Sequence, residues 1–413
     1  MKRRVVITGM GAVTPIGVGV DAFWEGLLAG RNGVERISLF DPSDYPCQIA
    51  AEVKDFDEKR FFDRKKARKM ARATQFGVAA SLLCLEDARW QESPGDSEVG
   101  VAAGISNSAR DVAETISDTV REHGYGRVLP YWLTKIFPHA TATETGLVTG
   151  FQSQVMTFAT ACTAGLNAIG YAVDQILQGR AEAFLCPSTD ATITDCTLAC
   201  FCKAGLVSTR NDDPAHASRP FDAKRDGGVL GEGAGCVLVE EYSHARRRGA
   251  PMLAEVRGFG TSGVGYNCDP SKAVPRGMVG VLNQALAAAN CGPNQIDYVG
   301  THGVSDVHLD AWETEAMKTV FGERAYRIPM SSVKSMIGIP QNAAGVLQLI
   351  STVKALSEGI IPATTNLEYP DPACDLDYVP NRPRRNTINN AVVLAHGFNG
   401  SDASVVVGRP VVH

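Results

Sequence analysis

The chain has 413 residues, 44% of them hydrophobic, and a formal net charge of −5 at pH 7. This length suffices for two domains or for one large duplicated core. The mildly acidic balance gives no general attraction for nucleic acid or a membrane surface. Eleven cysteines are scattered along the chain, and this odd number predicts reduced thiols and a cytoplasmic location. No run of about 18 apolar residues occurs, so no membrane span is expected.

Short apolar runs alternate with segments of helical periodicity along the chain. The runs predict buried strands, which we expect at 4–8, 100–104, 155–160, 181–188, 235–242, 296–300, 327–332 and 390–397. Helices are expected at 59–72, 75–87, 163–177, 278–289 and 344–356. The alternation favours an α/β protein with buried sheets. No Pro- or Ser-rich linker occurs, so we expect one pseudo-duplicated core, divided into residues 1–250 and 251–413.

Two weak motifs do not support a cofactor or metal site. Thr8–Gly11 follows a predicted strand as a dinucleotide-binding loop would, but Thr14 stands at the third glycine of GxGxxG. Cys196, Cys200 and Cys202 lack the spacing of a zinc ribbon or knuckle, so core packing or coincidence explains them better. We therefore expect neither a metal nor a cofactor.

Cys162 lies where a predicted strand runs through small residues into a predicted helix, in the segment FATACTAG. This places the thiol at a helix N-terminus, where unpaired N–H groups and the macrodipole favour the thiolate. The same N–H groups could hold an oxyanion, and hydrolases expose a nucleophilic serine at a similar turn. The alternative is a packed thiol, because free cysteine is among the most buried residue types.

Three polar residues follow the ends of predicted strands, namely His302, Lys334 and His396. Catalytic groups often lie at strand ends in α/β folds, although each of these residues alone is more often structural. A buried Lys334 would need an acidic partner, which Glu313 or Asp310 could supply. Together with the cysteine, these residues form a candidate catalytic constellation.

Over nearly its whole length the chain resembles the β-ketoacyl-ACP synthases, the type I/II ketosynthases of the thiolase superfamily. The resemblance is carried by the segments RVVITGMGAVTPIG, TACTAG, LVSTRNDDPAHASRPFDAKRDG, GEGAG, THG, SSVKSM and GFNGS. It implies a thiolase-like duplicated α-β-α-β-α five-layered fold, usually dimeric. The half 1–250 would carry the nucleophile, and the half 251–413 would carry His302, Lys334 and a glycine-rich gate.

The resemblance also implies a role for each site residue. Cys162 would take an acyl group from acyl carrier protein (ACP), and the backbone N–H groups of Cys162 and Phe398 would form the oxyanion hole. Phe398 would also act as a gate. His302 would hydrogen-bond the malonyl thioester carbonyl during decarboxylation, while Lys334 and Glu313 would organise the site by charge pairing. Attack of a thiolate on a thioester needs such pre-organised donors.

The departures from the family pattern concentrate in the condensation half of the site. Ile339 stands where the motif SMTGHxxGAAG has its second catalytic histidine, and losing one such donor costs about 10² to 10³ in rate. Val304 and Asp306 replace threonines that contact the pantetheine arm, and Gly228 replaces a common aromatic residue. The expected substrate-binding positions are Val304, Asp306, Ile339, His396 and Gly397.

The glycine-rich gate is also altered, at Asn399, Ser401 and Asp402. His396 lies two residues before Phe398, and we hypothesise that its imidazole partly replaces the lost histidine. The acylation half, which is Cys162 with its local frame, is intact.

A basic run at residues 64–69 predicts a docking surface for the acidic carrier protein, through Lys65, Arg68 and Lys69. The alternative is an ordinary solvated helix face. Charge complementarity mainly speeds the encounter, so docking should weaken with added salt.

Three functions fit the sequence. The first is a ketosynthase that condenses the acyl group on Cys162 with malonyl-ACP, in specialised polyketide or fatty-acid-like biosynthesis. The second is a ketosynthase-like acyltransferase that passes the acyl group to another acceptor without decarboxylation. The third is a chain-length-factor-like partner subunit of a heterodimeric ketosynthase, against which the retained cysteine argues. A homodimer or a heterodimer with a ketosynthase-like subunit is expected.

Overall fold

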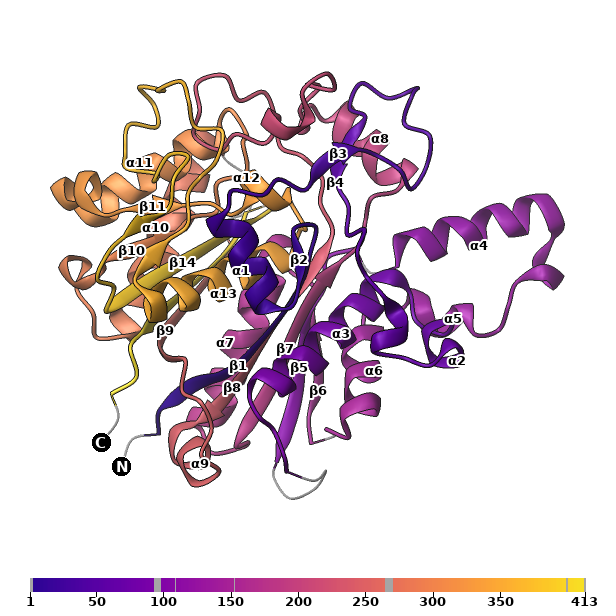
Figure 1. Ribbon diagram of the computed structural model, residues 1–413, viewed down its shortest axis with the longest axis horizontal. Helices are drawn as coiled ribbons and strands as arrows, with labels where there is room; N and C mark the ends of the chain where they lie inside the picture. Colours follow the sequence, from indigo (N-terminus) through magenta and orange to yellow (C-terminus); the bar gives the residue numbers. More distant parts are fainter. Residues whose placement is uncertain are drawn as a thin grey trace.

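A mixed β-sheet of eleven strands runs through the computed structural model, which describes residues 3–92, 98–107, 109–151, 153–263, 270–398 and 400–411 (Figure 1). Across the sheet the strands are β11 (Met330–Ser331), β10 (Tyr298–Gly300), β14 (Asn390–Gly397), β15 (Ser401–Gly408), β9 (Ala254–Gly263), β1 (Val5–Thr14), β8 (Gly233–Glu241), β7 (Ala183–Asp190), β5 (Val99–Gly104) and β6 (Val155–Phe158). The remaining strand, β2 (Gly17–Val18), pairs with β1.

The sheet repeats its own pairing pattern on either side of the contact between β1 and β9. Outward from β1, the pairs with β8 and β7 are antiparallel, and the pairs with β5 and β6 are parallel. Outward from β9, the pairs with β15 and β14 are antiparallel, and the pairs with β10 and β11 are parallel. This repetition confirms the predicted duplicated α/β fold. It also supports our proposal that the halves divide near residue 250, between β8 and β9.

Five layers follow from where the long helices pack. Helices α7 (Ala164–Leu177) and α13 (Ala343–Glu358) contact each other and strands of both halves, so they form the central layer. Helix α3 (Arg72–Asp87) covers β1 and β8, while α10 (Pro270–Ala288) covers β9 and β15. Helix α11 (Leu309–Phe321) packs on α10. The expected α-β-α-β-α arrangement is therefore present.

Shorter elements surround these layers. The other α-helices in the described part of the chain are α1 (Val20–Leu28), α2 (Arg64–Ala67), α4 (Arg110–His123), α5 (Trp132–Ile136), α6 (Ala140–Thr149), α8 (Asp195–Lys203), α9 (Tyr242–Arg247) and α12 (Lys334–Ile337). Two small sheets pair β3 (Val34–Arg36) with β4 (Ile49–Ala51) and β12 (Ile360–Ile361) with β13 (Arg384–Arg385). Helix α4 projects from the body (Figure 1). Within the described ranges, no helix has the length and apolar character needed to cross a membrane.

The predicted basic helix over 59–72 is wrong. A 3₁₀ turn at Glu58–Arg60 and the four-residue α2 replace it, and α3 begins only at Arg72. The Asp63 carboxylate accepts the N–H of Lys66 and so starts α2 as a separate helix. A continuous helix would also bring several like charges together on neighbouring turns.

The cysteine cluster on α8 is not part of the core. Cys196 and Cys200 are exposed and Cys202 is half-buried, so the packing interpretation was wrong for the first two. Among the described residues no group of three or more His, Cys, Asp or Glu side chains could hold a metal ion. Cys268 lies outside the described residues.

Candidate active site

Cys162 lies in a tight turn between β6 and α7, as its small-residue frame predicts. A 3₁₀ turn covers Ala161–Thr163, and Ala161 has a φ of 52°, a conformation rare for residues other than glycine. The start of α7 packs closely on the end of β5, because a Cβ on Gly104 would lie 2.5 Å from the Gly165 nitrogen. The turn thus holds a half-buried thiol at the beginning of a 14-residue helix.

The pKa of the Cys162 thiol is shifted in the direction opposite to the one expected. Burial, followed by the nearby Asp190 carboxylate, raises the pKa of Cys162 to about 11. The Lys334 ammonium and the backbone N–H groups of Cys162 and Phe398 act in the opposite direction. The expected net stabilisation of the thiolate is therefore wrong, because burial outweighs the helix N-terminus. Both of these backbone N–H groups therefore favour a negative charge at the sulfur.

His302 follows β10 and lies in a buried loop, with only 4% of the residue exposed. Its Nδ1 accepts the backbone N–H of His396 at 3.2 Å, which assigns the ring proton to Nε2. Burial, Lys334 and His396 hold the pKa of His302 well below its usual range. The imidazole is therefore neutral and offers Nε2–H as a donor.

Glu313 and Lys334 both form hydrogen bonds with the backbone of the loop that contains His302. The Glu313 carboxylate accepts the backbone N–H groups of His302 at 2.7 Å and Gly303 at 2.8 Å, and Lys334 Nζ donates to the His302 carbonyl. Among the described ion pairs, none joins Glu313 directly to Lys334, so their charges act across the loop. Burial raises the pKa of Glu313 to about 7 and lowers that of Lys334 to about 8. Both groups position the loop that carries His302.

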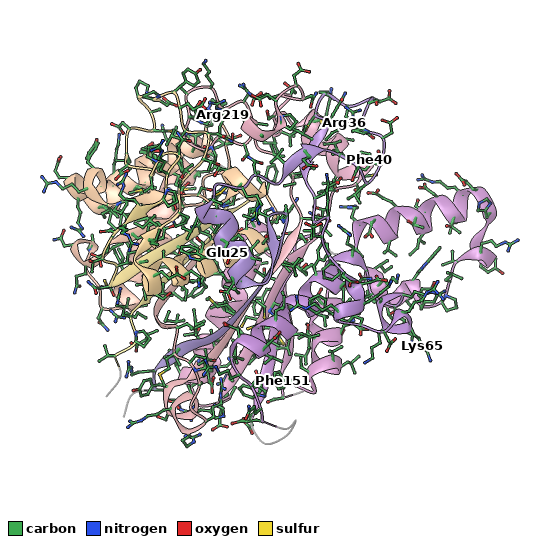
Figure 2. The ribbon with its side chains drawn as sticks, viewed as in Figure 1. Glu25, Arg36, Phe40, Lys65, Phe151 and Arg219 are labelled. Atoms are coloured by element: carbon green, nitrogen blue, oxygen red, sulfur yellow. The ribbon has the colours of Figure 1, made fainter. Side chains whose placement is uncertain are left out.

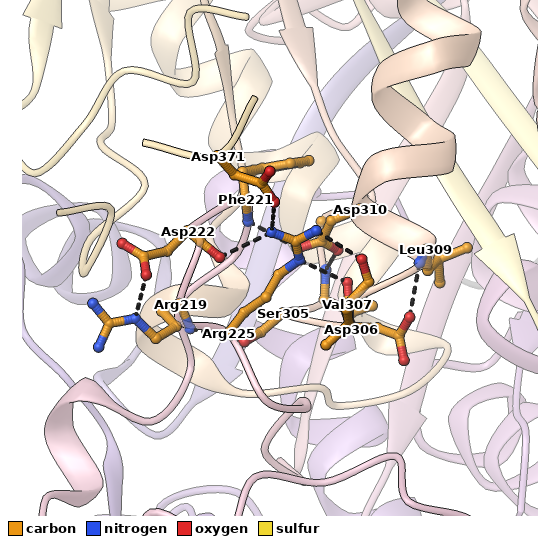
Figure 3. Close-up of polar contacts among 12 residues, drawn as sticks. Arg219, Phe221, Asp222, Arg225, Ser305, Asp306, Val307, Leu309, Asp310 and Asp371 are labelled. Carbon is orange, nitrogen blue, oxygen red and sulfur yellow. Dashed lines mark hydrogen bonds and ion pairs between the residues drawn. The ribbon is translucent and has the colours of Figure 1, made fainter. Parts of the chain in front are cut away.

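Asp310, the alternative acidic partner, supports the next part of the same loop. Its carboxylate accepts the N–H of Val304 at 3.0 Å and of Phe221 at 2.8 Å, and it lies 3.8 Å from Arg225 (Figure 3). Burial raises the pKa of Asp310 to about 6.

Ile339 and Gly228, two departures from the family motifs, are in contact. The Ile339 backbone is fixed by a bond from its N–H to Val229 at 2.8 Å and by one from the Gly231 N–H at 3.1 Å. A Cβ on Gly228 would collide with Cδ1 of Ile339 and would lie 2.9 Å from the Val304 carbonyl oxygen. Ile339, Gly228 and Val304 thus form one small packed unit without a side-chain hydrogen-bond donor.

Asp306 begins α11. Its carboxylate accepts the N–H groups of His308 at 2.9 Å and Leu309 at 2.7 Å, and its carbonyl accepts Arg225 Nε at 3.0 Å (Figure 3). This carboxylate is therefore engaged within the protein, and its contact with substrate stays a prediction.

His396 forms a buried pair with Asp402, its cross-strand neighbour on β15. Nδ1 of His396 lies 2.7 Å from the Asp402 carboxylate, which also accepts the Ser262 hydroxyl at 3.3 Å. The His396 and His302 rings are 5.9 Å apart at an interplanar angle of 74°. The structure therefore brings His396 beside His302. The Asp402 partnership could not be read from the sequence.

The glycine-rich segment that we expect to act as a gate begins directly after His396. Gly397 ends β14 at a position where a Cβ would lie 3.2 Å from the Thr160 carbonyl oxygen. Phe398 is 61% exposed, while its N–H is one of the two at the Cys162 sulfur. Asn399 lies outside the described residues.

The predicted docking cations are exposed and share one surface. Arg64, Lys65, Arg68 and Lys69 line an open hollow of about 460 Å³ together with Tyr131. Lys65, which belongs to α2, lies at the edge of the molecule (Figure 2). None of these four cations takes part in an ion pair among the described residues, so their charge is available to a partner.

Comparison with known proteins identifies the family. The family models described as "Beta-ketoacyl synthase, N-terminal domain" and "Beta-ketoacyl synthase, C-terminal domain" match residues 2–245 and 253–368. The chain is 39% identical over 406 residues to a 3-oxoacyl-[acyl-carrier-protein] synthase 2 of Synechocystis, covering 98% of this chain and 97% of that protein. It is 39% identical over 421 residues to the tetracenomycin polyketide synthase ketoacyl synthase alpha subunit of Streptomyces glaucescens, covering 99% and 98%.

A solved structure, the ishigamide ketosynthase/chain length factor, superimposes with a TM-score of 0.93 at 30% identity and covers 100% of both chains. This agreement confirms the thiolase-like fold. The chain belongs to the β-ketoacyl synthase family.

Proposed function

We propose that this protein is a ketosynthase that takes an acyl chain from acyl carrier protein onto Cys162 and condenses it with malonyl-ACP, in specialised polyketide or fatty-acid-like biosynthesis. The observation that carries the proposal is that three groups favour a negative charge on one sulfur, namely the backbone N–H groups of Cys162 and Phe398 and the Lys334 ammonium. Lys334 also donates to the His302 carbonyl, which links the neutral His302 imidazole to the same site.

Acylation begins when the Cys162 thiol loses its proton. Lys334 stabilises the thiolate, whose sulfur attacks the thioester carbonyl carbon of the carrier-bound chain. The resulting oxyanion accepts the N–H groups of Cys162 and Phe398, which lie at the sulfur. The carrier's thiol then leaves with a proton, and the acyl group remains on Cys162.

Condensation needs a donor for the enolate oxygen of the extender. When malonyl-ACP loses carbon dioxide, the electrons of the broken C–C bond form an enolate, and His302 Nε2–H stabilises its oxygen. The enolate carbon attacks the acyl carbonyl, and the bond to the Cys162 sulfur breaks. Ile339 provides no second donor, so we expect this step to be slower by about 10² to 10³ than in a site with two imidazoles.

The acyl carrier protein is the proposed partner at the basic hollow lined by Lys65, Arg68 and Lys69. Their exposure and their lack of internal ion pairs support this assignment. An acidic carrier would gain mainly in association rate.

A second ketosynthase-like subunit, identical or related, is the proposed partner at the β6 edge of the sheet. Large apolar side chains are exposed along the chain leading to this edge, namely Val120, Tyr125, Leu129, Leu133, Phe137, Leu147, Val155 and Met156. An unpaired strand flanked by exposed apolar residues is typical of an interface.

We also propose a cytoplasmic location, because the chemistry needs a free thiol and none of the ten described cysteines forms a disulfide.

One experiment separates the three functions. The purified protein is incubated with acyl-ACP, with and without malonyl-ACP, and intact mass and carbon dioxide release are followed, with Cys162→Ala as the control. A Cys162 adduct that proceeds to a β-ketoacyl product with carbon dioxide supports the ketosynthase. An adduct without carbon dioxide supports the acyltransferase, and the absence of any adduct supports the partner subunit.

A further inference from the structure

A cluster of polar groups joins three segments beside the Cys162 turn. Asp190, the last residue of β7, is fully buried. Its carboxylate accepts the backbone N–H groups of Ser106 at 3.3 Å, Asn107 at 3.1 Å and Asn342 at 3.2 Å. The Asn342 side-chain amide donates to Asp190 as well. This carboxylate therefore ties the loop after β5 to the segment before α13.

The cluster borders the nucleophile. The Ile105 N–H donates to the carbonyl of Phe158, the last residue of β6, at 3.0 Å. Ser188 donates to the Asn342 carbonyl at 3.2 Å, and a Cβ on Gly165 would lie 2.9 Å from the Ser188 Cβ. The negative charge of Asp190 also raises the pKa of Cys162. These segments are therefore neighbours of the Cys162 turn, and an acyl chain that leaves the sulfur on this side would meet them.

Two donors in the cluster have no partner among the described residues. The Gln341 side-chain carbonyl accepts Asn107 Nδ2 at 3.1 Å, but Gln341 Nε2 is buried and unpaired. The Ser106 hydroxyl is likewise buried and unpaired. Gln341 is only 6% exposed, and its φ of 47° is unusual for a residue other than glycine. Buried polar groups are nearly always hydrogen-bonded, so unpaired ones need an explanation.

A hydrocarbon chain on Cys162 would leave both donors unpaired, whereas a chain with oxygen atoms could accept their hydrogen bonds. We propose that Gln341, held by Asn107, and Ser106 form a subsite that selects an acyl group with oxo or hydroxy substituents. This inference rests on the proposed acylation of Cys162 and deepens it by naming the class of chain that the cysteine carries.

The test compares N-acetylcysteamine thioesters of hexanoic, 3-oxohexanoic, 3-hydroxyhexanoic and 5-oxohexanoic acid. The second-order rate of Cys162 acylation is measured by intact mass. We expect at least one oxygenated substrate to react about tenfold faster than hexanoyl, because a buried hydrogen bond left unmade costs that much or more. Equal rates for all four, or the fastest rate for hexanoyl, would overturn the proposal.

Variants locate the selectivity. Gln341→Leu should lower the rate for the preferred oxygenated substrate about tenfold and leave the hexanoyl rate within twofold. Ser351→Ala is the matched control, since it removes another buried, unpaired hydroxyl from the middle of α13 and should change neither rate. If Gln341→Leu lowers both rates equally, the residue acts on folding or on the nucleophile, and the proposed subsite is wrong.

Binding of unreactive analogues keeps this inference separate from the proposed function. In these analogues an amide nitrogen replaces the thioester sulfur, and the wild-type protein is titrated with the hexanoyl and oxohexanoyl forms. If no thioester acylates Cys162, the proposed function fails, and the subsite is then judged by these affinities alone. Tighter binding of an oxo analogue, lost in Gln341→Leu, supports the subsite, and equal binding overturns it.

Discussion

Ile339→His is the most informative single change in this site. Ile339 lies over Gly228, whose missing Cβ leaves the room that the Ile339 side chain fills. The backbone on both sides is fixed by Val229 and Gly231, so an imidazole at this position should occupy the same space. The change would place a second donor in the condensation half while Cys162 and its turn stay unaltered.

The expected magnitude follows from the number of donors. The described site offers His302 Nε2–H as the imidazole donor, and one such donor is worth about 10² to 10³ in rate. We therefore expect Ile339→His to raise carbon dioxide release from malonyl-ACP by about 10²-fold or more, with acylation of Cys162 changed less than twofold. The assay follows release of carbon dioxide from labelled malonyl-ACP by the pre-acylated protein.

Two controls make this result interpretable. Ile339→Phe supplies a planar ring without a donor and should give no gain. Adding Gly228→Ala to Ile339→His should reduce the gain, because with the present backbone a Cβ at position 228 would lie 2.9 Å from the Val304 carbonyl oxygen and would collide with the side chain at position 339. If Ile339→His and Ile339→Phe behave alike, then the missing donor does not limit condensation and the reasoning is refuted.

Three further changes test other parts of the proposal. Lys65→Glu with Arg68→Glu should slow acylation by carrier-bound substrate about tenfold at low salt, and an equal loss with small thioesters would argue against docking. His396→Ala should lower turnover about tenfold if its imidazole assists condensation, whereas unchanged turnover would exclude that role. Lys334→Met should raise the pKa of Cys162 above about 11. With a pKa of about 11, about one Cys162 thiol in 10³ is ionised at pH 8. The rate at which iodoacetamide alkylates Cys162 at that pH should therefore fall about tenfold in the variant. An unchanged rate would show that the Lys334 charge does not act on the thiol.

The Cys162 turn could be predicted because its signals are local. An apolar run, several small residues and a helical pattern follow one another within residues 155–177, and the strand, turn and helix form as expected. The direction in which the pKa of the Cys162 thiol is shifted could not be predicted. It depends on burial and on Asp190, which comes from a different strand.

The polar cluster around Asp190 could not be predicted either, because it also joins residues that are far apart in the sequence. Asn107 and Gln341 are separated by 234 positions and Asp190 and Asn342 by 152, and no local pattern reports such pairings. The prediction of a helix for the basic segment before α3 was wrong for a different reason. Its composition favours a helix, but the Asp63 cap divides it.

Two of the residues that the resemblance marks as departures, Ile339 and Asp402, have close partners in the structure. Ile339 fills the space above Gly228, and Asp402 is paired with His396. A void or an unpaired group in a buried site costs about 1 to 3 kcal/mol, and the contacts of Ile339 with Gly228 and of Asp402 with His396 avoid that cost at these two places.

These two pairs, beside the Cys162 turn, favour our proposal of a site adapted to a different substrate or to a slower condensation. A subunit that only shapes its partner's pocket would have no use for a nucleophile held between two backbone N–H donors. This supports the two acyl-transferring functions over the partner subunit, and the I339H experiment then decides between them. Malonyl decarboxylation that is already measurable in the wild type and rises in the variant supports the ketosynthase. Decarboxylation that appears only in the variant supports transfer of the acyl group to another acceptor.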